Sequence, residues 1–198
     1  MRLDHLVVTC ATLSEGAAWL EEVLGVPTQP GGHHPRMGTH NRLLSLGPDE
    51  YLEVIAPDPD APAPDRPRWF ALDRRAAPGF TNWAVRTDDM EADLVRMPDG
   101  TGEPVAMERG DLRWRFAVPD DGEQPMDGAS PALLQWDGPH PAPMLEDVGC
   151  RLLSLTVRTP RPDRLVPIVP HDARIGVEEG PFGLRALFRT PSGEKTLS

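Results

Sequence analysis

The chain has 198 residues, of which 39% are apolar, so it can bury one well-packed core or at most two small domains. Its net charge of −11 repels nucleic-acid phosphates and anionic membrane surfaces, which argues against both as partners. The N-terminus lacks a basic segment followed by an apolar one, as a secretory leader would have, and no apolar run approaches the roughly 20 residues of a membrane span. Cys10 and Cys150 lack metal-type spacing. Together these features lead us to expect a cytoplasmic protein.

The first structural unit is expected at residues 1–57. Ser14 is a suitable helix N-cap, Gly25 a suitable stop, and the apolar residues between them recur at helical spacing. A loop rich in glycine and histidine follows this helix. The expected order is a strand, a helix and two further strands: Leu3–Cys10, Glu15–Leu24, Asn41–Leu46 and Glu50–Ala56.

A second unit is expected at residues 80–137, after a proline-rich connector at 58–79. It repeats the order of the first unit and adds one strand. Asp88 or Asp89 caps its short helix, which extends to Met97. The expected strands are Phe80–Thr87, Glu103–Glu108, Leu112–Val118 and Ala132–Trp136.

A partial third unit is expected at residues 138–198. Its segment TVRTPRPDRLV resembles AVRTDDMEADLV of the second unit, but Pro162 and Pro167 shorten the helix. Strands are expected near Ile175 and at 184–188. Repeated units of this length favour an α+β fold in which the units share one curved mixed sheet around a cleft.

His5 and Glu53 are the first candidates for chemistry. Successive side chains of a strand face opposite ways, so if Leu6 faces the helix, His5 faces the concave side. The same alternation places Tyr51 and Glu53 on that side. A carboxylate among apolar residues needs a partner, which could be a metal, a protonated histidine or a ligand cation. The alternatives are that His5 and Glu53 only hydrogen-bond each other, or that Glu53 faces water.

The loop GGHHPRMGTHNRL is the densest polar feature. His33, His34 and His40 could be metal ligands or general bases, although loop histidines in contact with solvent explain the pattern as well. The glycines permit a close backbone approach. Thr39 and Asn41 could hydrogen-bond the loop to the strand that follows. We favour His34, because the neighbouring Pro35 implies a defined shape.

In the strand DLRWRFAV, Trp114 belongs to the apolar face and Arg115 to the polar one. The arginines could bind an anionic substrate, but a solvated face is the more common role. No phosphate-binding loop, dinucleotide fingerprint or nucleophile elbow is present.

The segments DHLVV, HHPRMGTHNRL, YLEVI, FTNWAVRTDDMEADL and PALLQW followed by HPAP resemble the glyoxalase-like proteins of the vicinal oxygen chelate superfamily. The resemblance implies paired βαβββ modules around a cleft. It also implies a divalent ion held by the first and last strand of each module. By position, His5 and Glu53 fill the two ligand places of the first module. In the second module Trp83 stands where His5 does, and Gln135 lies near the place of Glu53.

Two functional hypotheses follow. The first is a divalent-metal-dependent lyase, isomerase or dioxygenase acting on a small oxygenated metabolite. Such an enzyme could form a homodimer. His5, Glu53 and Gln135 would bind the ion, and His34 and Glu53 would be catalytic. The second is a metal-free ligand-binding or drug-sequestering protein of the bleomycin-resistance type. Expected substrate contacts are Thr39, Asn41, Tyr51, Trp83, Trp114 and Arg115.

Overall fold

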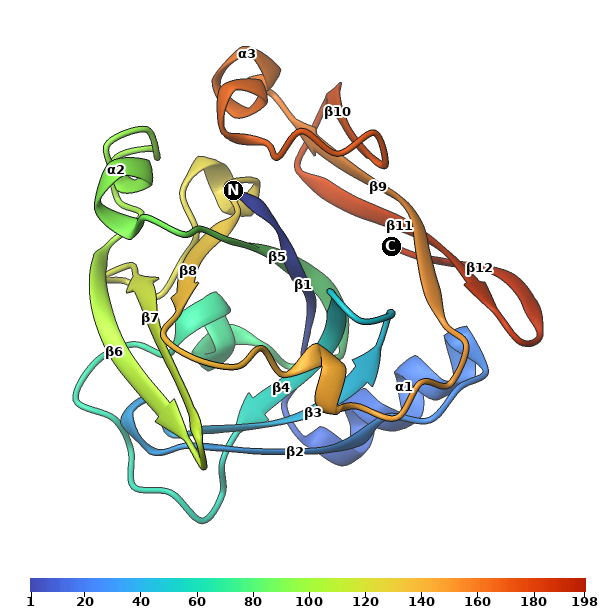
Figure 1. Cartoon of the computed structure of the whole chain (residues 1–198). Coiled ribbons are helices and arrows are strands. Elements are labelled where there is room, and N and C mark those ends of the chain that lie inside the picture. The colour runs from blue at the N-terminus through green and yellow to red at the C-terminus, as the bar shows by residue number, and fades with distance from the viewer.

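The computed structural model describes all 198 residues and confirms the α+β fold with its curved mixed sheet (Figure 1). The first unit is a complete βαβββ module. Its elements are β1 Arg2–Thr9, α1 Leu13–Leu24, β2 Gln29–His34, β3 Thr39–Ser45 and β4 Tyr51–Pro57.

The second module repeats the first. Its elements are β5 Gly79–Arg86, α2 Met90–Leu94, β6 Glu103–Arg109, β7 Leu112–Val118 and β8 Ala132–Trp136. In each module the last strand pairs parallel with the first, and the middle strands pair antiparallel. Because β1 pairs antiparallel with β5, the two modules form one sheet of eight strands in the order β2-β3-β4-β1-β5-β8-β7-β6.

The eight strands curl into a half-barrel, so that the outer strands β2 and β6 come into contact (Figure 1). The concave side holds a core that includes Val7, Ile55, Ala84 and Leu134. The right-handed twist of a sheet favours this curling when one face is filled by side chains. The hollow therefore lies between the two modules.

The third unit forms a separate sheet of four strands. It comprises β9 Arg151–Thr159, α3 Pro162–Leu165, β10 Ile175–Glu179, β11 Gly183–Thr190 and β12 Gly193–Leu197. Its order is β10-β9-β11-β12, so the strand after the helix, not the last strand, pairs parallel with the first. This sheet lies beside β5 and α1 and covers the convex face of the half-barrel (Figure 1).

Short 3₁₀ turns connect the larger elements: η1 Pro35–Met37, η2 Trp69–Arg74, η3 Met126–Gly128, η4 Ala142–Met144 and η5 Val166–Ile168. None of the helices combines the length and the apolarity needed to cross a membrane.

Two local features differ from the sequence-based expectations. The N-cap of α1 is Thr12, whose hydroxyl accepts a hydrogen bond from the Glu15 backbone, so the helix starts before the expected Ser14 cap. The segment expected as a loop after the helix contains β2. Its Gly-Gly and proline content hid an edge strand, which tolerates such residues because only one of its sides is paired.

Gly16 allows α1 to lie directly on the sheet. A Cβ atom at this position would stand 2.4 Å from Cys10 Sγ and 2.7 Å from Val54 Cγ1. We expect Gly16→Ala to destabilise the fold by about 1–3 kcal/mol, because overpacking outweighs the roughly 1 kcal/mol gained in helix propensity. Urea unfolding measures the change. Ser14→Ala, at an exposed position of the same helix, is the control and should change stability by under about 1 kcal/mol. An equal or higher stability of Gly16→Ala would contradict the close packing.

Candidate functional site

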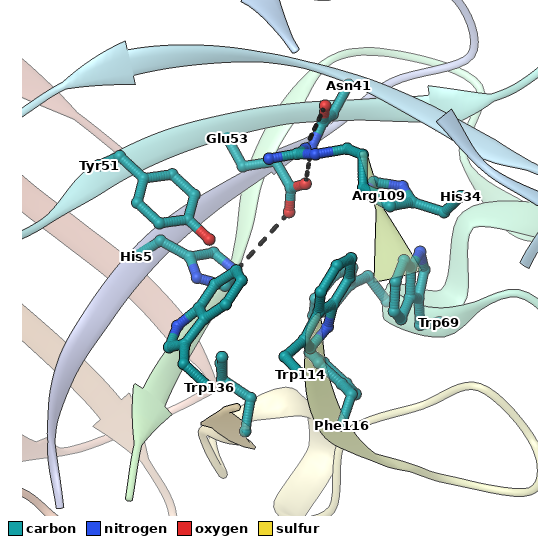
Figure 2. Close-up of a pocket in the computed structure, with 12 residues that line it drawn as sticks. His5, His34, Asn41, Tyr51, Glu53, Trp69, Arg109, Trp114, Phe116 and Trp136 are labelled. Atoms are coloured by element: carbon teal, nitrogen blue, oxygen red, sulfur yellow. Dashed lines mark hydrogen bonds and ion pairs between the residues drawn. The ribbon is translucent and has the colours of Figure 1, made fainter. Parts of the chain in front are cut away.

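A small cavity lies in the hollow of the half-barrel (Figure 2). Its volume is about 30 Å³, which is room for about two waters. Both modules contribute to its walls. The lining residues are His5, His34, Asn41, Tyr51, Glu53, Trp69, Phe70, Arg109, Trp114, Phe116, Leu134 and Trp136.

His5 reaches the cavity through an irregularity in β1. The register between β1 and β5 shifts between Leu3 and His5, so Asp4 is an extra residue with no partner across the ladder. A bulge of this kind redirects side chains. Asp4 Oδ1 lies 2.6 Å from His5 Nδ1. The carboxylate therefore accepts the Nδ1 proton and leaves His5 Nε2 free toward the cavity.

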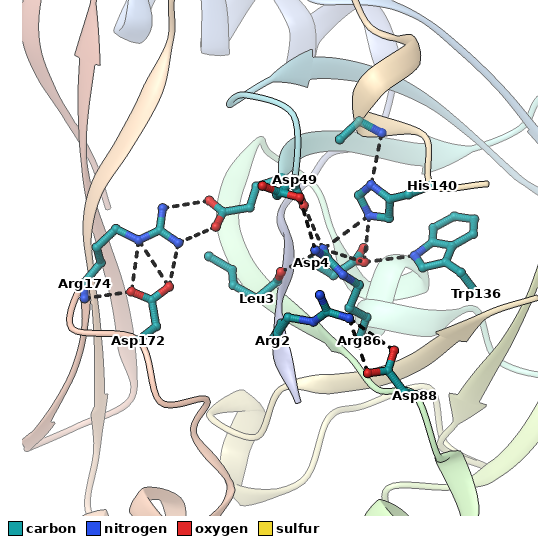
Figure 3. A network of polar contacts seen from close by, with 12 residues as sticks. Arg2, Leu3, Asp4, Asp49, Arg86, Asp88, Trp136, His140, Asp172 and Arg174 are labelled. Atoms are coloured by element: carbon teal, nitrogen blue, oxygen red, sulfur yellow. Dashed lines mark hydrogen bonds and ion pairs between the residues drawn. The ribbon is translucent and has the colours of Figure 1, made fainter. Parts of the chain in front are cut away.

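Asp4 is fully buried and serves several further donors (Figure 3). Its Oδ2 lies 2.9 Å from Trp136 Nε1, 3.0 Å from His140 Nε2 and 3.5 Å from an Arg86 guanidinium nitrogen. Burial raises the pKa of a carboxyl group, but the hydrogen bonds from His140 and His5 outweigh this effect and hold the pKa of Asp4 well below its usual range. Asp4 is thus a permanently charged anchor for residues of both modules.

Glu53 faces His5 across the cavity. The distance between His5 Nε2 and Glu53 Oε2 is 3.6 Å, and the side chains are 5% and 8% exposed (Figure 2). Asn41 donates an amide hydrogen bond to Glu53 Oε1. The side-chain oxygen Oδ1 of Asn41 accepts hydrogen bonds from the Arg109 guanidinium, at 3.0 Å, and from the Gly32 backbone N–H, at 2.8 Å. Asn41 therefore connects the carboxylate with the guanidinium.

The two glycines of β2 make this arrangement possible. A Cβ atom on Gly31 would stand 2.0 Å from Asn41 Oδ1, and one on Gly32 would stand 2.5 Å from Arg109 Cδ. The expected close approach of backbone and side chains at these glycines is thus confirmed. The stem of Arg109 lies against the bare backbone and carries the guanidinium over to Asn41.

Tyr51 and His34 are both held uncharged. Burial, and next the charge of Asp4, raise the pKa of Tyr51 well above its usual range, so the side chain stays a hydroxyl. Burial, and next the charge of Arg109, lower the pKa of His34 to about 3. His34 Nδ1 lies 3.1 Å from the Thr39 hydroxyl, which orients the ring. Tyr51 stacks on His5 with ring centroids 4.7 Å apart.

Aromatic rings separate the cavity from an outer groove. His34 and Trp114 line both spaces, and their rings meet edge to face with centroids 6.0 Å apart. The groove is larger, with a volume of about 400 Å³, and it lies between η1 and the β6–β7 hairpin. His34 and Trp114 therefore stand between the cavity and the groove.

The structure brings together six of the residues expected from the sequence: His5, His34, Asn41, Tyr51, Glu53 and Trp114 all line the cavity. Thr39 does not line it but lies behind His34 as its hydrogen-bond partner.

Three expected site residues lie on the opposite side of the sheet. Trp83 is fully buried in the convex core, because the third unit covers this face. Its indole N–H donates a hydrogen bond to the Ala129 carbonyl oxygen. Gln135 accepts hydrogen bonds from the Met90 backbone and from Arg115. Arg115 also forms an ion pair with the exposed Glu91. Their expected roles as pocket wall, metal ligand and substrate contact are therefore corrected.

In the strand register, Ala84 and Leu134 occupy the positions of the second module that match His5 and Glu53, rather than Trp83 and Gln135. Tyr51 pairs with His5 and stands two residues before Glu53; Ala132 pairs with Ala84 and stands two residues before Leu134. Neither alanine nor leucine can bind a metal. The cavity thus supplies two of the four ligands that the resemblance implies, and the neighbouring Asn41 presents a donor rather than an acceptor. This set of ligand atoms does not fit the divalent ion that the resemblance implies.

Asp4, Arg109 and Trp136 are the main residues that sequence reasoning missed. Strict alternation assigned Asp4 to the helix side, and only the Asp-His dipeptide itself hinted at a pair. Arg109 ends an edge strand and acts across the gap between the modules, to Asn41 of β3. Trp136 follows the mis-assigned Gln135 by one position, so the same one-residue error concealed it.

We expect Asp4→Asn to destabilise the fold by about 2–4 kcal/mol, because an amide presents N–H groups to a site built of donors and leaves the nearby Arg86 without its buried counter-charge. Urea unfolding measures the loss. Asp88→Asn is the matched control: Asp88 also pairs with an arginine, Arg2, but its side chain is 90% exposed, so the change should be below about 1 kcal/mol (Figure 3). Equal effects of the two substitutions would refute the anchoring role of Asp4.

Comparison with known proteins agrees with the fold. The model of the glyoxalase-like domain family matches residues 3–171. A hypothetical protein from Staphylococcus aureus is 16% identical, with 90% of this chain and 86% of that chain covered and a TM-score of 0.59. Methylmalonyl-CoA epimerase from Mycobacterium tuberculosis is 24% identical, with 68% and 86% covered and a TM-score of 0.41.

A Streptomyces coelicolor methylmalonyl-CoA epimerase in complex with 2-nitronate-propionyl-CoA is 18% identical, with 69% and 96% covered and a TM-score of 0.43. No curated protein sequence matches the chain. The family model covers most of the chain, and the paired βαβββ modules agree with it. The chain therefore belongs to the glyoxalase-like domain family.

Proposed function

We propose that the protein is an isomerase-type enzyme that moves a proton on a small oxygenated molecule by means of its own side chains. The observation that carries this proposal is the approach of His5 Nε2 to the Glu53 carboxylate, at 3.6 Å, in a small cavity. Two groups that can carry a proton and that face each other across a small space are what a proton transfer between neighbouring atoms requires.

His5 is the base in this proposal. A general base needs a free lone pair and a fixed orientation. The Asp4 carboxylate provides the orientation by accepting the Nδ1 proton, at 2.6 Å, and it stabilises the imidazolium that forms when Nε2 takes up a proton. The stacked Tyr51 ring prevents the imidazole from tilting away.

Glu53 returns the proton. His5 Nε2 takes the proton from one carbon, the proton passes to Glu53 Oε2, 3.6 Å away, and Glu53 delivers it to the same or a neighbouring carbon. The result is a net isomerisation with no atoms gained or lost, and both groups return to their starting state. Asn41 holds the Glu53 carboxylate by its amide N–H, which fixes the carboxylate position between turnovers. The roles of His5 and Glu53 can reverse with the direction of the reaction.

A carbonyl next to the acidic C–H bond is the substrate feature that suits the remaining lining. Removal of the proton places negative charge on the carbonyl oxygen, and such charge is stabilised by fixed donors in a dry site. Tyr51 remains a neutral hydroxyl donor, and Arg109 adds a positive charge at the cavity wall. The surrounding aromatic rings exclude water and limit the substrate to a small molecule.

Binding without catalysis is the second candidate function. It is favoured by the aromatic walls: Trp114 and Trp136 meet with centroids 5.2 Å apart and, together with Tyr51, line the cavity beside Glu53. Rings near a carboxylate suit a cationic aromatic compound. Arg109 opposes such a ligand electrostatically, and for this reason we place the enzyme first.

The test is proton exchange. Purified protein in D₂O with excess chelator is incubated with a panel of small 2-oxo acids, hydroxy aldehydes and dicarbonyl compounds, and loss of the C–H signal is followed by proton NMR. We expect exchange with at least one compound. His5→Gln and Glu53→Gln should each reduce the rate by about 10²–10⁴-fold, the usual contribution of an acid–base group.

His171→Gln is the matched control, since it removes an exposed imidazole outside the cavity and should leave the rate unchanged. Exchange that appears only when a divalent ion is supplied would contradict the proposed use of side chains alone. Thermal stabilisation by a cationic ligand without exchange of any compound would favour the binding protein instead.

A further inference from the structure

A second cluster of metal-binding residue types lies outside the cavity. His33, His40 and Asp58 each offer one ligand atom, and these atoms all lie within 4.8 Å of one another. The three residues come from β2, β3 and the segment directly after β4. Two imidazoles and a carboxylate that converge from three separate segments form a potential three-ligand site.

The cluster lies on the side of the sheet that faces away from the cavity. His40 pairs with Ala56 of the convex core, whereas its neighbour Asn41 pairs with Ile55 of the concave core. His33 is the cross-strand partner of His40, so the two imidazoles share one face, with ring centroids 5.9 Å apart. This cluster is therefore separate from His5 and Glu53.

Asp58 is held in place before any ion binds. It is 7% exposed, its backbone N–H donates to the Gly38 carbonyl oxygen, and its Oδ1 accepts the Asp60 backbone N–H at 3.1 Å. Its Oδ2 lies 2.6 Å from His33 Nδ1. A buried carboxylate whose side-chain partner is an exposed, movable imidazole keeps a lone pair available for a cation in that direction.

We propose that His33, His40 and Asp58 bind a divalent transition-metal ion of the zinc type at the β2–β3 edge of the sheet. Ligand atoms about 2.0–2.2 Å from a tetrahedral ion lie about 3.3–3.6 Å apart. The three atoms are already within 4.8 Å, so the site closes when the exposed His33 and the half-buried His40 side chains shift and the ion takes the place of the shared proton between His33 and Asp58. Water fills the fourth position.

The donor set selects the class of ion. Two imidazole nitrogens and one carboxylate oxygen suit zinc, cobalt or nickel, whereas magnesium and calcium prefer oxygen ligands alone. Because the ion would join β2 to β3 and to the end of β4, it would fix the hairpin that carries His34 and Asn41 on its other face. The ion would thus support the wall of the cavity from the other face of the sheet.

The experiment uses untagged full-length protein that has been stripped with chelator and then dialysed against micromolar Zn²⁺. Mass spectrometry of the metal content should give one zinc per chain, and Co²⁺ should give a visible absorption band typical of a tetrahedral site. His33→Gln and His40→Gln should each weaken Zn²⁺ affinity by more than about 100-fold, beyond the roughly 10–100-fold loss that is common for a residue that only supports a ligand. The melting temperature should rise with Zn²⁺ in the unmodified protein but not in the His33→Gln or the His40→Gln variant.

Two control variants locate the ion. His171→Gln removes an exposed histidine outside the cluster, and Glu53→Gln removes the cavity carboxylate; both should bind zinc as the unmodified protein does. Failure to take up stoichiometric zinc, or uptake that persists in both His33→Gln and His40→Gln, would overturn the proposal. Uptake abolished by Glu53→Gln would place the ion in the cavity instead, which also overturns it.

Discussion

The structure depends on one buried charge, the carboxylate of Asp4. It accepts hydrogen bonds from His5 of β1, Trp136 of β8 and His140 beyond β8, and Arg86 of β5 provides a positive charge 3.5 Å away. A carboxylate that is fully removed from water is costly unless all its lone pairs are used. Satisfying Asp4 therefore requires both modules to be in register. The same interaction fixes the imidazole of the candidate site, so folding and the site share one constraint.

The two modules have the same backbone topology but contribute different kinds of residues to the site. The first supplies the polar centre, with His5, Asn41 and Glu53 on three neighbouring strands. The second supplies Ala84 and Leu134 at the positions that match His5 and Glu53, together with aromatic walls. Loss of two ligands is compatible with the fold because apolar residues suit the concave core. What the second module retains for the polar centre is Arg109, which acts through Asn41 instead of through an ion.

Periodicity and turn residues were sufficient to predict the order of elements in the two modules apart from β2, two strands of the second module to the residue, and the meeting of His5 with Glu53. They failed where alternation gives no signal. Both faces of β5 and β8 are apolar or buried, so nothing in FTNWAVR or ALLQW distinguishes one face from the other, and Trp83 and Gln135 were assigned to the wrong side. Asp4 was not identified as a site residue for a related reason. A bulge shifts every assignment that precedes it, and no residue type in the strand marks the bulge.

Strands β3 and β4 connect the two candidate sites through their alternation. Asn41 and Glu53 face the cavity, while His40 lies on the reverse of β3 and Asp58 directly follows β4. If an ion held β3 through His40 to β2 and to the end of β4, β3 could not twist without moving the side chains on its other side, since successive residues share one backbone. The short hydrogen-bond path from Arg109 through Asn41 to Glu53 is sensitive to such movement, because hydrogen bonds weaken steeply with misalignment. A structural ion behind β3 would therefore act on the geometry of the cavity without touching a ligand inside it.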